Sequence, residues 1–211
     1  MRFYDQQILP YLIHAAMQQP RFTVYRRRVV SAATGRVLEI GAGSGLNVPL
    51  YSATASSVVG LDPSPALVAR ARQAQRAPAP AHLSAPRQPT FLLGSADAIP
   101  LDTASVDTVV TTWTLCSIPD APRALGEVRR VLRPSGRLLF VEHGRAPDST
   151  VARWQDRLTP LWRRIAGGCH LNRAMDQLIR DSGFAIEQMT TDYMPGPRPM
   201  TFMYEGRARP I

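Results

Sequence analysis

The sequence predicts an α/β fold in which helices cover a mostly parallel, doubly wound sheet. Two observations support this prediction. An apolar run, Val37–Ile40, ends in three glycines spaced by two, Gly41, Gly43 and Gly45, as at a strand-to-helix turn that passes under a nucleotide. Further along, short apolar runs alternate with helical patterns up to about residue 142, which is typical of parallel β-α-β units.

Strands are expected at the apolar runs, and five of them precede residue 145. They are 37–40, 58–62, 90–93, 106–112 and 137–142. After them, Ala185–Tyr193 and Met200–Glu205 alternate in polarity, which predicts a closing antiparallel hairpin. The complete sheet is therefore expected to hold seven strands, mostly parallel, with the hairpin at its C-terminal end.

Helical patterns lie between these strands and ahead of the first one. They are expected at 5–18, 21–33, 65–76, 120–132, 149–166 and 171–182. Ser64-Pro65 gives the third of these helices a capping residue and a proline in its first turn. Gly45–Tyr51 is expected to open a further helix that Pro49 shortens or bends, and the proline-rich stretch 77–89 predicts a surface loop. We divide this single-domain chain into an N-terminal helical cap, 1–35, and the sheet domain, 36–211.

Composition fits one globular domain, since the chain has 211 residues, of which 45% are hydrophobic and 19% charged. The net charge of +9 comes from arginine alone, because the sequence contains no lysine. A basic balance favours nucleic acid, anionic membranes or acidic substrates as partners. However, the dense cluster Arg26-Arg27-Arg28 stands beside Val29 and Val30 and is interpreted as the solvated face of a helix, so nucleic-acid binding is disfavoured.

The two cysteines, Cys116 and Cys169, are too few and too far apart in sequence to predict a disulfide framework or a metal site. The apolar run Ile8–Met17 is short and is interrupted by Pro10 and His14, so neither a signal peptide nor a membrane span is expected. A cytoplasmic location with reduced thiols is the expectation that follows. Weak peripheral contact with anionic lipid is kept as an alternative, and no oligomeric state is predicted.

Two carboxylates flank the glycine-rich turn. Glu39 precedes Gly41 by two residues, and Asp62 ends the second apolar run, where an acid meets the ribose hydroxyls of a bound nucleoside. A dinucleotide fingerprint needs a small residue at Leu46, and Glu39 would repel a pyrophosphate. A cationic adenosine-type ligand such as S-adenosylmethionine suits the pattern better, because a partly desolvated carboxylate attracts its sulfonium and ammonium groups. A glycine-rich turn in another nucleotide-binding fold is the alternative.

Further segments resemble the class I S-adenosylmethionine-dependent methyltransferases. Phe91–Pro100 resembles their third strand and adenine-bracketing segment, Val106–Trp113 their fourth strand, and Glu127–Gly136 the helix and turn before strand five. The resemblance implies a Rossmann-like methyltransferase fold with S-adenosylmethionine as cofactor, and Ser95 or Asp97 as acceptor for the adenine amino group. The implied cofactor-binding set is Glu39, Gly41, Gly43, Gly45, Asn47, Asp62, Pro63, Ser95, Ala96, Asp97, Thr112 and Trp113.

A second group of segments is similar to the methyltransferase-like thiol S-methyltransferases and their bacterial relatives. These segments are Cys116-Ser117, Val131–Pro134, Phe140–His143, Trp154-Gln155, Pro160–Trp162 and Gly167–Arg173. The resemblance implies S-methylation of a small-molecule thiol. A weaker similarity to small bacterial phospholipid N-methyltransferases leaves phospholipid or small-amine N-methylation as an alternative. A nucleic-acid methyltransferase and a non-catalytic cofactor-binding protein are the others.

Candidate catalytic and substrate-binding residues follow the strand ends and one loop between helices, since ligands bind outside the carboxyl ends of parallel strands. His143 or His170 is expected to take the acceptor's proton, because imidazole titrates near neutral pH and a thiol is already partly ionised there. As alternatives, His143 caps a loop and His170 caps the following helix. The candidate substrate-binding set is Trp113, Cys116, Trp154, His170 and Asn172.

The other candidates in this set also have structural alternatives. Trp113 packs beneath the cofactor in one interpretation and contacts the substrate in the other. Cys116 in an apolar setting is interpreted as an unreactive buried thiol. Trp154 and Trp162 stand eight residues apart, and both are interpreted as core residues on one helical face, with a place in the pocket wall as the alternative.

Overall fold

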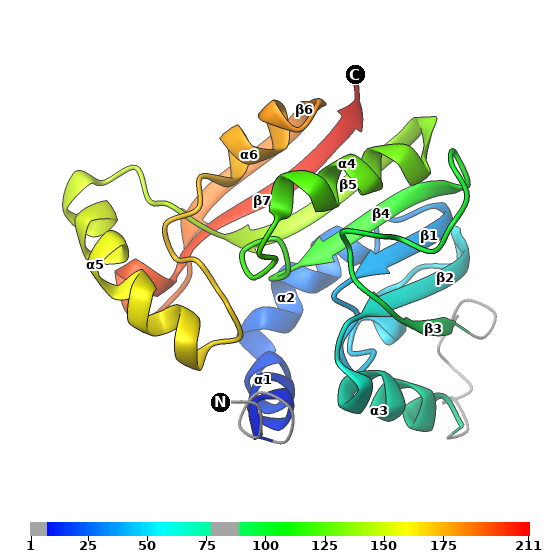
Figure 1. Ribbon diagram of the computed structural model, residues 1–211, viewed down its shortest axis with the longest axis horizontal. Helices are drawn as coiled ribbons and strands as arrows, with labels where there is room; N and C mark the ends of the chain where they lie inside the picture. The colour runs from blue at the N-terminus through cyan, green and yellow to red at the C-terminus, as the bar shows by residue number, and fades with distance from the viewer. Residues whose placement is uncertain (1–7, 77–88) are drawn as a thin grey trace.

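The computed structural model describes residues 8–76 and 89–211. A seven-stranded sheet runs through the molecule in the order β3-β2-β1-β4-β5-β7-β6 (Figure 1). Its strands are β1 (Gly35–Ile40), β2 (Ala55–Asp62), β3 (Thr90–Leu93), β4 (Val106–Thr112), β5 (Leu132–His143), β6 (Phe184–Tyr193) and β7 (Phe202–Pro210). The pairs from β3 to β5 are parallel, and β7 runs antiparallel to both β5 and β6. The predicted fold class, with its C-terminal antiparallel hairpin, is confirmed.

Helices lie on both faces of this sheet (Figure 1). They are α1 (Leu9–Met17), α2 (Pro20–Val30), α3 (Pro65–Gln75), α4 (Ala121–Val131), α5 (Ser149–Ile165) and α6 (Met175–Asp181), with 3-10 turns η2 (Val48–Leu50) and η3 (Arg198–Met200). Because successive strand residues point to opposite faces, the side holding Leu38 and Val109 packs against α4 and α6. The side holding Val37 and Val110 packs against α2.

Local sequence signals explain where several helices begin and end. The Ser64 hydroxyl accepts a hydrogen bond from the backbone N–H of Leu67 at the start of α3, and Asp120 caps α4 through the N–H of Arg123. Gly183, with φ +83, follows the end of α6, in a conformation that suits glycine at a helix C-terminus. These capping and terminating residues lie within a residue or two of the predicted boundaries.

The predicted helix at Gly45–Tyr51 is wrong. Only the 3-10 turn η2 lies between β1 and β2. Gly45 has φ +79, which is incompatible with an α-helix, and Pro49 cannot donate a backbone hydrogen bond. The chain therefore returns from the carboxyl end of β1 to the amino end of the parallel strand β2 without an α-helix, and the carbonyl of Thr54 accepts a hydrogen bond of 2.8 Å from the N–H of Gly35 at the start of β1.

Some other expectations need correction or are untested. Trp154 is not a core residue, because it is 51% exposed, whereas Trp162 is half-buried against the core. Eight residues turn an α-helix by about 80° beyond two full turns, so the two indoles do not share a direction. The predicted loop at 77–89 falls almost entirely outside the described residues. The boundary between 1–35 and 36–211 stays a prediction, although α2 shares the core of the sheet.

Candidate active site

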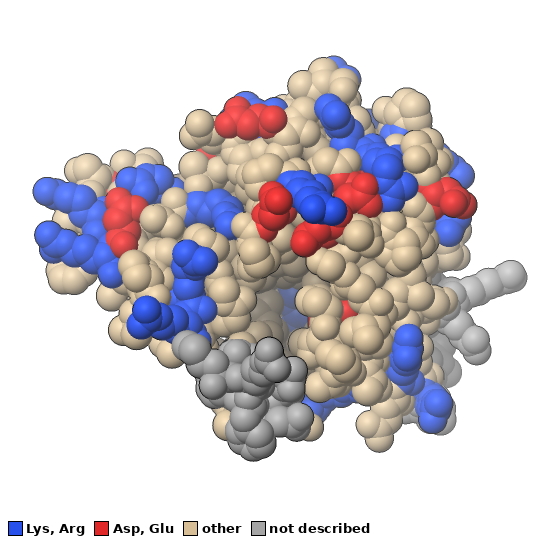
Figure 2. All heavy atoms as spheres, in the orientation of Figure 1, with Lys and Arg blue, Asp and Glu red and all other residues tan. Residues whose placement is uncertain are grey.

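A cavity of about 400 Å³ opens where the carboxyl ends of β1, β2 and β4 meet, and Figure 2 shows a hollow in the middle of one face of the molecule. The lining comes from the loops after these strands, from the segment after β3, and from α1. Ligands of open α/β sheets bind at this position because loops with free backbone groups converge there.

The glycine-rich loop forms the floor of the cavity. Gly41, Gly43 and Gly45 all have positive φ angles, of +70, +56 and +79. A Cβ on Gly41 would overlap the side chain of Thr114, whereas a Cβ on Gly43 would meet no atom closer than 3.9 Å and would project into free space. Gly45 does not line the cavity; its Cβ position lies 3.0 Å from the ring of Phe91. The loop thus offers bare backbone to a ligand at Gly43, while Gly45 serves packing.

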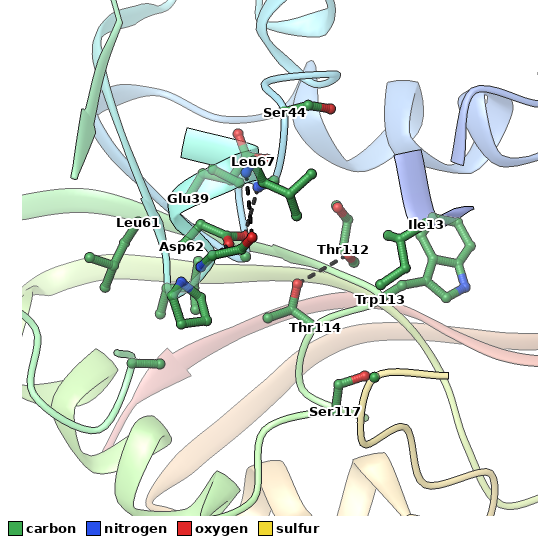
Figure 3. A pocket seen from close by; sticks show the side chains of 18 of the residues that line it. Ile13, Glu39, Ser44, Leu61, Asp62, Leu67, Thr112, Trp113, Thr114 and Ser117 are labelled. Carbon is green, nitrogen blue, oxygen red and sulfur yellow. Dashed lines mark hydrogen bonds between the residues drawn. The ribbon is translucent and has the colours of Figure 1, made fainter. Parts of the chain in front are cut away.

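Asp62 lies beside this loop at the end of β2 (Figure 3). Its Oδ2 accepts a hydrogen bond of 2.9 Å from the N–H of Gly43, and its Oδ1 accepts one of 2.8 Å from the N–H of Ser64. Burial raises the pKa of Asp62, and these two backbone hydrogen bonds partly offset that effect. The carboxylate is therefore fixed in orientation and has lone pairs left for the hydroxyls of a sugar.

Glu39 lies at the base of the cavity in a buried polar network. Asn47 donates to its Oε1 and the Tyr51 hydroxyl donates to its Oε2, both at 2.8 Å. Burial raises the pKa of Glu39 to about 7, against the lowering effects of Tyr51, Asn47 and Arg26. Asn47 also donates to the hydroxyl of Thr112 at 3.1 Å. The predicted residues Glu39, Asn47 and Thr112 are thus brought together, and all three line the cavity.

Arg26 completes this network and was not a predicted site residue. It is only 4% exposed, and it donates to Asn47 Oδ1, the carbonyl of Met17 and the hydroxyl of Thr23. The interpretation of Arg26-Arg27-Arg28 as a solvated face is therefore wrong for Arg26. Its position beside the apolar residues Val29 and Val30 was the signal in the sequence that Arg26 could point inward. Its partner Asn47 lies on another segment of the chain, so the sequence did not reveal this contact.

The segment after β3 forms the wall opposite α1. Ser95, Ala96 and Asp97 line the cavity there, together with Pro63 from the end of β2. Ala96 is buried, whereas Ser95 is exposed and Asp97 is half-buried. The predicted adenine-binding residues therefore share one wall, next to Asp62, which could contact the ribose.

Trp113 follows β4 and lies between the polar floor and α1 (Figure 3). Its φ is +52, an uncommon value for a bulky residue and one that marks local strain. The N–H of Trp113 donates to the carbonyl of Val141 at 2.8 Å, and its indole meets Phe22 and Tyr25 edge-on. The indole thus packs against α2 and also lines the cavity. Both predicted roles of Trp113, packing and contact with a ligand, are therefore compatible with its position.

The part of the cavity under α1 is apolar, with Leu9, Ile13 and Met17 on one side and Ile118 on the other. His14 is the titratable residue of this part. Its Nδ1 lies 2.5 Å from Ser44 Oγ and its Nε2 lies 2.9 Å from the amide nitrogen of Gln18. Since an amide nitrogen only donates, Nε2 accepts and Nδ1–H donates to Ser44. Burial, followed by the charge of Arg70, lowers the pKa of His14.

The histidines predicted as catalytic, His143 and His170, do not line this cavity. His143 is buried, and its Nε2 lies 3.0 Å from Cys169 Sγ. His170 is half-buried, its Nδ1 lies 3.1 Å from the carbonyl oxygen of Cys116, and burial and Arg173 lower its pKa. Both rings are thus directed to neighbours behind the cavity wall. His170 does not cap α6, because the capping position belongs to Ala174.

Three predicted substrate-binding residues also lie away from the cavity lining. Cys116 is buried beside His143, and Trp154 is exposed on α5 under the guanidinium of Arg157. Asn172 donates to Asp156 at 2.8 Å. The positions of Cys116 and Asn172 follow from contacts between segments distant in sequence, which spacing along the chain did not reveal.

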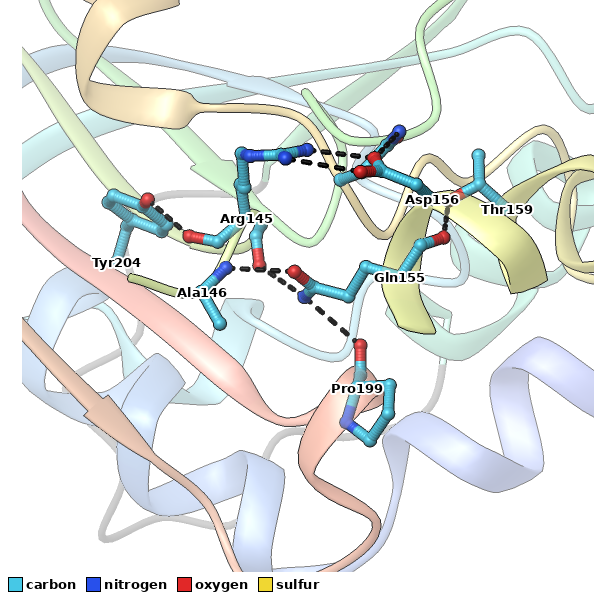
Figure 4. A network of polar contacts seen from close by, with 9 residues as sticks. Arg145, Ala146, Gln155, Asp156, Thr159, Pro199 and Tyr204 are labelled. Atoms are coloured by element: carbon cyan, nitrogen blue, oxygen red, sulfur yellow. Dashed lines mark hydrogen bonds and ion pairs between the residues drawn. The ribbon is translucent and has the colours of Figure 1, made fainter. Parts of the chain in front are cut away.

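Asp156, the hydrogen-bond partner of Asn172, belongs to a polar network between α5 and the chain after β5 (Figure 4). Arg145 forms a two-pronged contact with Asp156, at 2.8 and 3.1 Å. The buried amide of Gln155 accepts from the N–H of Ala146 and donates to the carbonyls of Gly144 and Pro199. The network fixes the chain just after β5 onto α5, which indicates a structural role for this region.

Comparison with known proteins agrees with this geometry. The profile of the methyltransferase domain family matches residues 38–140. Thiol S-methyltransferase TMT1B from Homo sapiens is 35% identical over 167 residues, covering 76% of this chain and 65% of that protein. A phosphatidylethanolamine N-methyltransferase from Cereibacter sphaeroides is 34% identical over 172 residues, covering 79% of this chain and 74% of that protein. The chain belongs to the class I S-adenosylmethionine-dependent methyltransferases.

The chain spans slightly less than two thirds of the thiol S-methyltransferase's own length. Among solved structures, the [4+2]-cyclase SpnF matches with a TM-score of 0.71 at 18% identity, over 100% of this chain and 94% of that one. At that identity the likeness concerns the fold alone, since one fold hosts many activities. Within the described ranges 8–76 and 89–211, every helix is too short or too polar to cross a bilayer.

Proposed function

We propose that this protein transfers the methyl group of S-adenosylmethionine to a small, lipophilic thiol. The observation that supports this most is the division of one cavity into a polar part and an apolar part. Its charged lining residues in the described chain are Arg26 of α2 and, around the ends of the β-strands, Glu39, Asp62 and Asp97. The remainder is covered by α1, which presents apolar side chains and His14. One part suits a charged nucleoside, and the other suits an uncharged acceptor.

The polar part fits S-adenosylmethionine by its chemistry. Two buried carboxylates, Glu39 and Asp62, face a cavity, and desolvated carboxylates favour a ligand with positive charge. Gly43 leaves a cradle that a side chain would fill. In this proposal Asp62 accepts hydrogen bonds from the ribose hydroxyls, and the segment around Ala96 binds the adenine ring. When bound, this cofactor supplies an electrophilic methyl group on a positively charged sulfur.

The apolar part would position the acceptor. Leu9, Ile13 and Met17 of α1 give a lipophilic body an apolar surface within the cavity. A thiol with a pKa near 8.5 is ionised to a few per cent at neutral pH, so it needs positioning more than strong base catalysis. An ammonium acceptor would instead call for a carboxylate in this part of the cavity.

We assign proton acceptance to His14 rather than to His143 or His170. His14 lines the cavity and is held neutral by burial, because its pKa is lowered. Its Nε2 lone pair now accepts from the exposed amide of Gln18, a contact that water or a thiol can replace. Ser44, which accepts from Nδ1–H, fixes this tautomer and joins His14 to the glycine-rich loop.

The proposal is tested by supplying S-adenosylmethionine labelled in the methyl group with a panel of alkyl and aryl thiols, primary amines and phosphatidylethanolamine vesicles. The labelled thioether is expected as the main product. Asp62→Asn should abolish labelling with every acceptor. His14→Gln should lower kcat about tenfold to a hundredfold near pH 6.5, with recovery toward pH 9, where the thiol ionises unaided. Labelling of amines or lipid without any thioether would contradict the thiol assignment.

Phospholipid N-methylation is the second candidate, and one surface favours it. Trp154 and Leu161 are exposed on α5, 51% and 61% respectively, beside Arg157 and Arg164, and Figure 2 shows arginines gathered over this helix. Apolar side chains flanked by arginines suit an anionic lipid surface. Phospholipid N-methylation would be supported if methylated phosphatidylethanolamine were the main product of the panel. The product should then be lost in the double variant Trp154→Ala and Leu161→Ala.

A further inference from the structure

Cys116, His143 and Cys169 meet behind the wall of the cavity. One sulfur or nitrogen atom from each lies within 4.8 Å of the other two, and Nε2 of His143 is 3.0 Å from Sγ of Cys169. These are the two cysteines of the whole sequence. They come from the loop after β4 and the turn after α5, and the histidine ends β5. Three separate segments therefore deliver soft donor atoms to one point.

We propose that Cys116, His143 and Cys169 bind one thiophilic metal ion, and we assign Zn²⁺ as that ion. Two thiolates and one imidazole form a donor set that favours Zn²⁺ or Cu⁺ over the hard cations Mg²⁺ and Ca²⁺. Catalytic Zn²⁺ sites have three protein ligands, in one type two sulfurs and one nitrogen, and leave the fourth position to an external ligand. This site is separate from the cavity of the proposed methyl transfer.

The surroundings of the three residues favour this assignment. All three side chains are buried, with exposures of 2%, 7% and 8% for Cys116, His143 and Cys169. A free thiolate there would be costly, whereas Zn²⁺ with two thiolates is neutral as a unit. Nε2 is the nitrogen of His143 that faces Cys169 Sγ, whereas Nδ1 has no hydrogen-bond partner within the described ranges.

The backbone around Cys116 is held for such a role by two side chains that are not ligands, Glu142 and Arg173. The buried carboxyl group of Glu142 accepts hydrogen bonds of 3.0 to 3.3 Å from the backbone N–H groups of Thr114, Leu115 and Cys116. Arg173 donates to the carbonyls of Leu115 and Ile118. The cysteine is thus presented on a loop whose polar groups already have partners, which leaves its sulfur directed to Cys169 and His143.

The metal would fasten together two loops that wall the cavity. Ser117, next to Cys116, and Gly167, two residues before Cys169, both line it. The loops already touch, since the N–H of His170 donates to the carbonyl of Cys116 at 2.8 Å. Neither cysteine lines the cavity, so a metal bridge between the two loops would leave the space for the ligand free.

The test is metal content and spectroscopy on the full chain, independent of methyl transfer. Protein stripped with a chelator and reduced is dialysed against Zn²⁺, and bound zinc is measured by elemental mass spectrometry. About one equivalent is expected, and Co²⁺ in its place should give thiolate-to-metal charge-transfer absorption. Cys116→Ser, Cys169→Ser and His143→Gln should each weaken zinc binding at least about tenfold. The matched control His170→Gln should keep it.

Several results would overturn the proposal. These are no zinc in the reduced wild type, unchanged binding after either cysteine substitution, or loss with His170→Gln in place of His143→Gln. A reduced protein that binds no metal but oxidises to a Cys116–Cys169 disulfide, seen as a mass loss of two hydrogens, would assign the pair to redox chemistry. Should a variant misfold, alkylation of the stripped wild type with and without added Zn²⁺ decides, because bound Zn²⁺ must slow alkylation of both thiols beyond the protection that burial alone gives.

Discussion

Glu39→Gln is the substitution that best separates the electrostatic account of the site from a purely steric one. Glu39 is 2% exposed, and its oxygens accept hydrogen bonds from Asn47 and Tyr51. Glutamine has nearly the same shape. Its Oε1 can still accept from Asn47 while its Nε2 donates to the Tyr51 hydroxyl, so the network can be kept while the negative charge is removed. If the charge attracts a cationic cofactor, the substitution should change how binding depends on pH.

The size of the effect follows from the pKa of Glu39, which burial raises to about 7. A cation favours the ionised carboxylate, so binding lowers this pKa and releases a proton. From pH 8 to pH 6 the ionised fraction falls from about nine tenths to about one tenth. The apparent Kd for S-adenosylmethionine should therefore rise about tenfold, or about 1.4 kcal/mol.

Isothermal titration of S-adenosylmethionine into wild type and Glu39→Gln at both pH values measures this difference. The variant should bind more weakly at pH 8 and should lose most of the pH dependence, and any titration of the ligand itself is common to both proteins. Asp97→Asn removes a carboxylate from the same cavity and should keep the wild-type dependence. Equal pH slopes in wild type and Glu39→Gln, or tighter wild-type binding at pH 6, would refute the reasoning.

Two further predictions concern the loop and the α5 network. Gly41→Ala should destabilise the protein by about 2 kcal/mol or more in urea unfolding, because φ is +70 and the new Cβ overlaps Thr114. Gly43→Ala should lower the free energy of unfolding by only about 1 kcal/mol, but it should also weaken cofactor binding. Equal destabilisation by the two substitutions would contradict this account. Gln155→Leu should cost about 2–4 kcal/mol, since it strands three backbone groups, whereas exposed Trp154→Ala should change stability by about 0.5 kcal/mol. A Gln155→Leu protein as stable as wild type would remove the structural role of that network.

Local patterns carried most of the information on the fold and on the polar part of the site. The spacing of Gly41, Gly43 and Asp62 predicted a tight turn under a ligand, and the structure joins Gly43 to Asp62 through one hydrogen bond. Such contacts are predictable because strand alternation and parallel pairing fix which strand ends meet. Ser64 and Asp120 likewise form caps where short-range rules place them.

The apolar part of the site was not predictable in the same way. His14 lies on α1, and it reaches the cavity because it contacts Ser44, thirty residues away. Arg26 points inward because Asn47 accepts its hydrogen bond. His143 lies at a strand end, as expected, but its imidazole contacts Cys169 and does not line the cavity. In each case a tertiary contact determines the side-chain direction, and spacing along the chain does not encode it.

The central claim is that a cationic sulfur donor and an uncharged thiol share one cavity. It is tested most directly by mass spectrometry of the reaction with S-adenosylmethionine carrying a labelled methyl group and a long-chain alkyl thiol. The account predicts the labelled thioether together with an equal amount of demethylated cofactor, both absent with Asp62→Asn. Formation of neither product by folded wild-type protein, with calorimetric heat from a nicotinamide or flavin nucleotide instead, would contradict it.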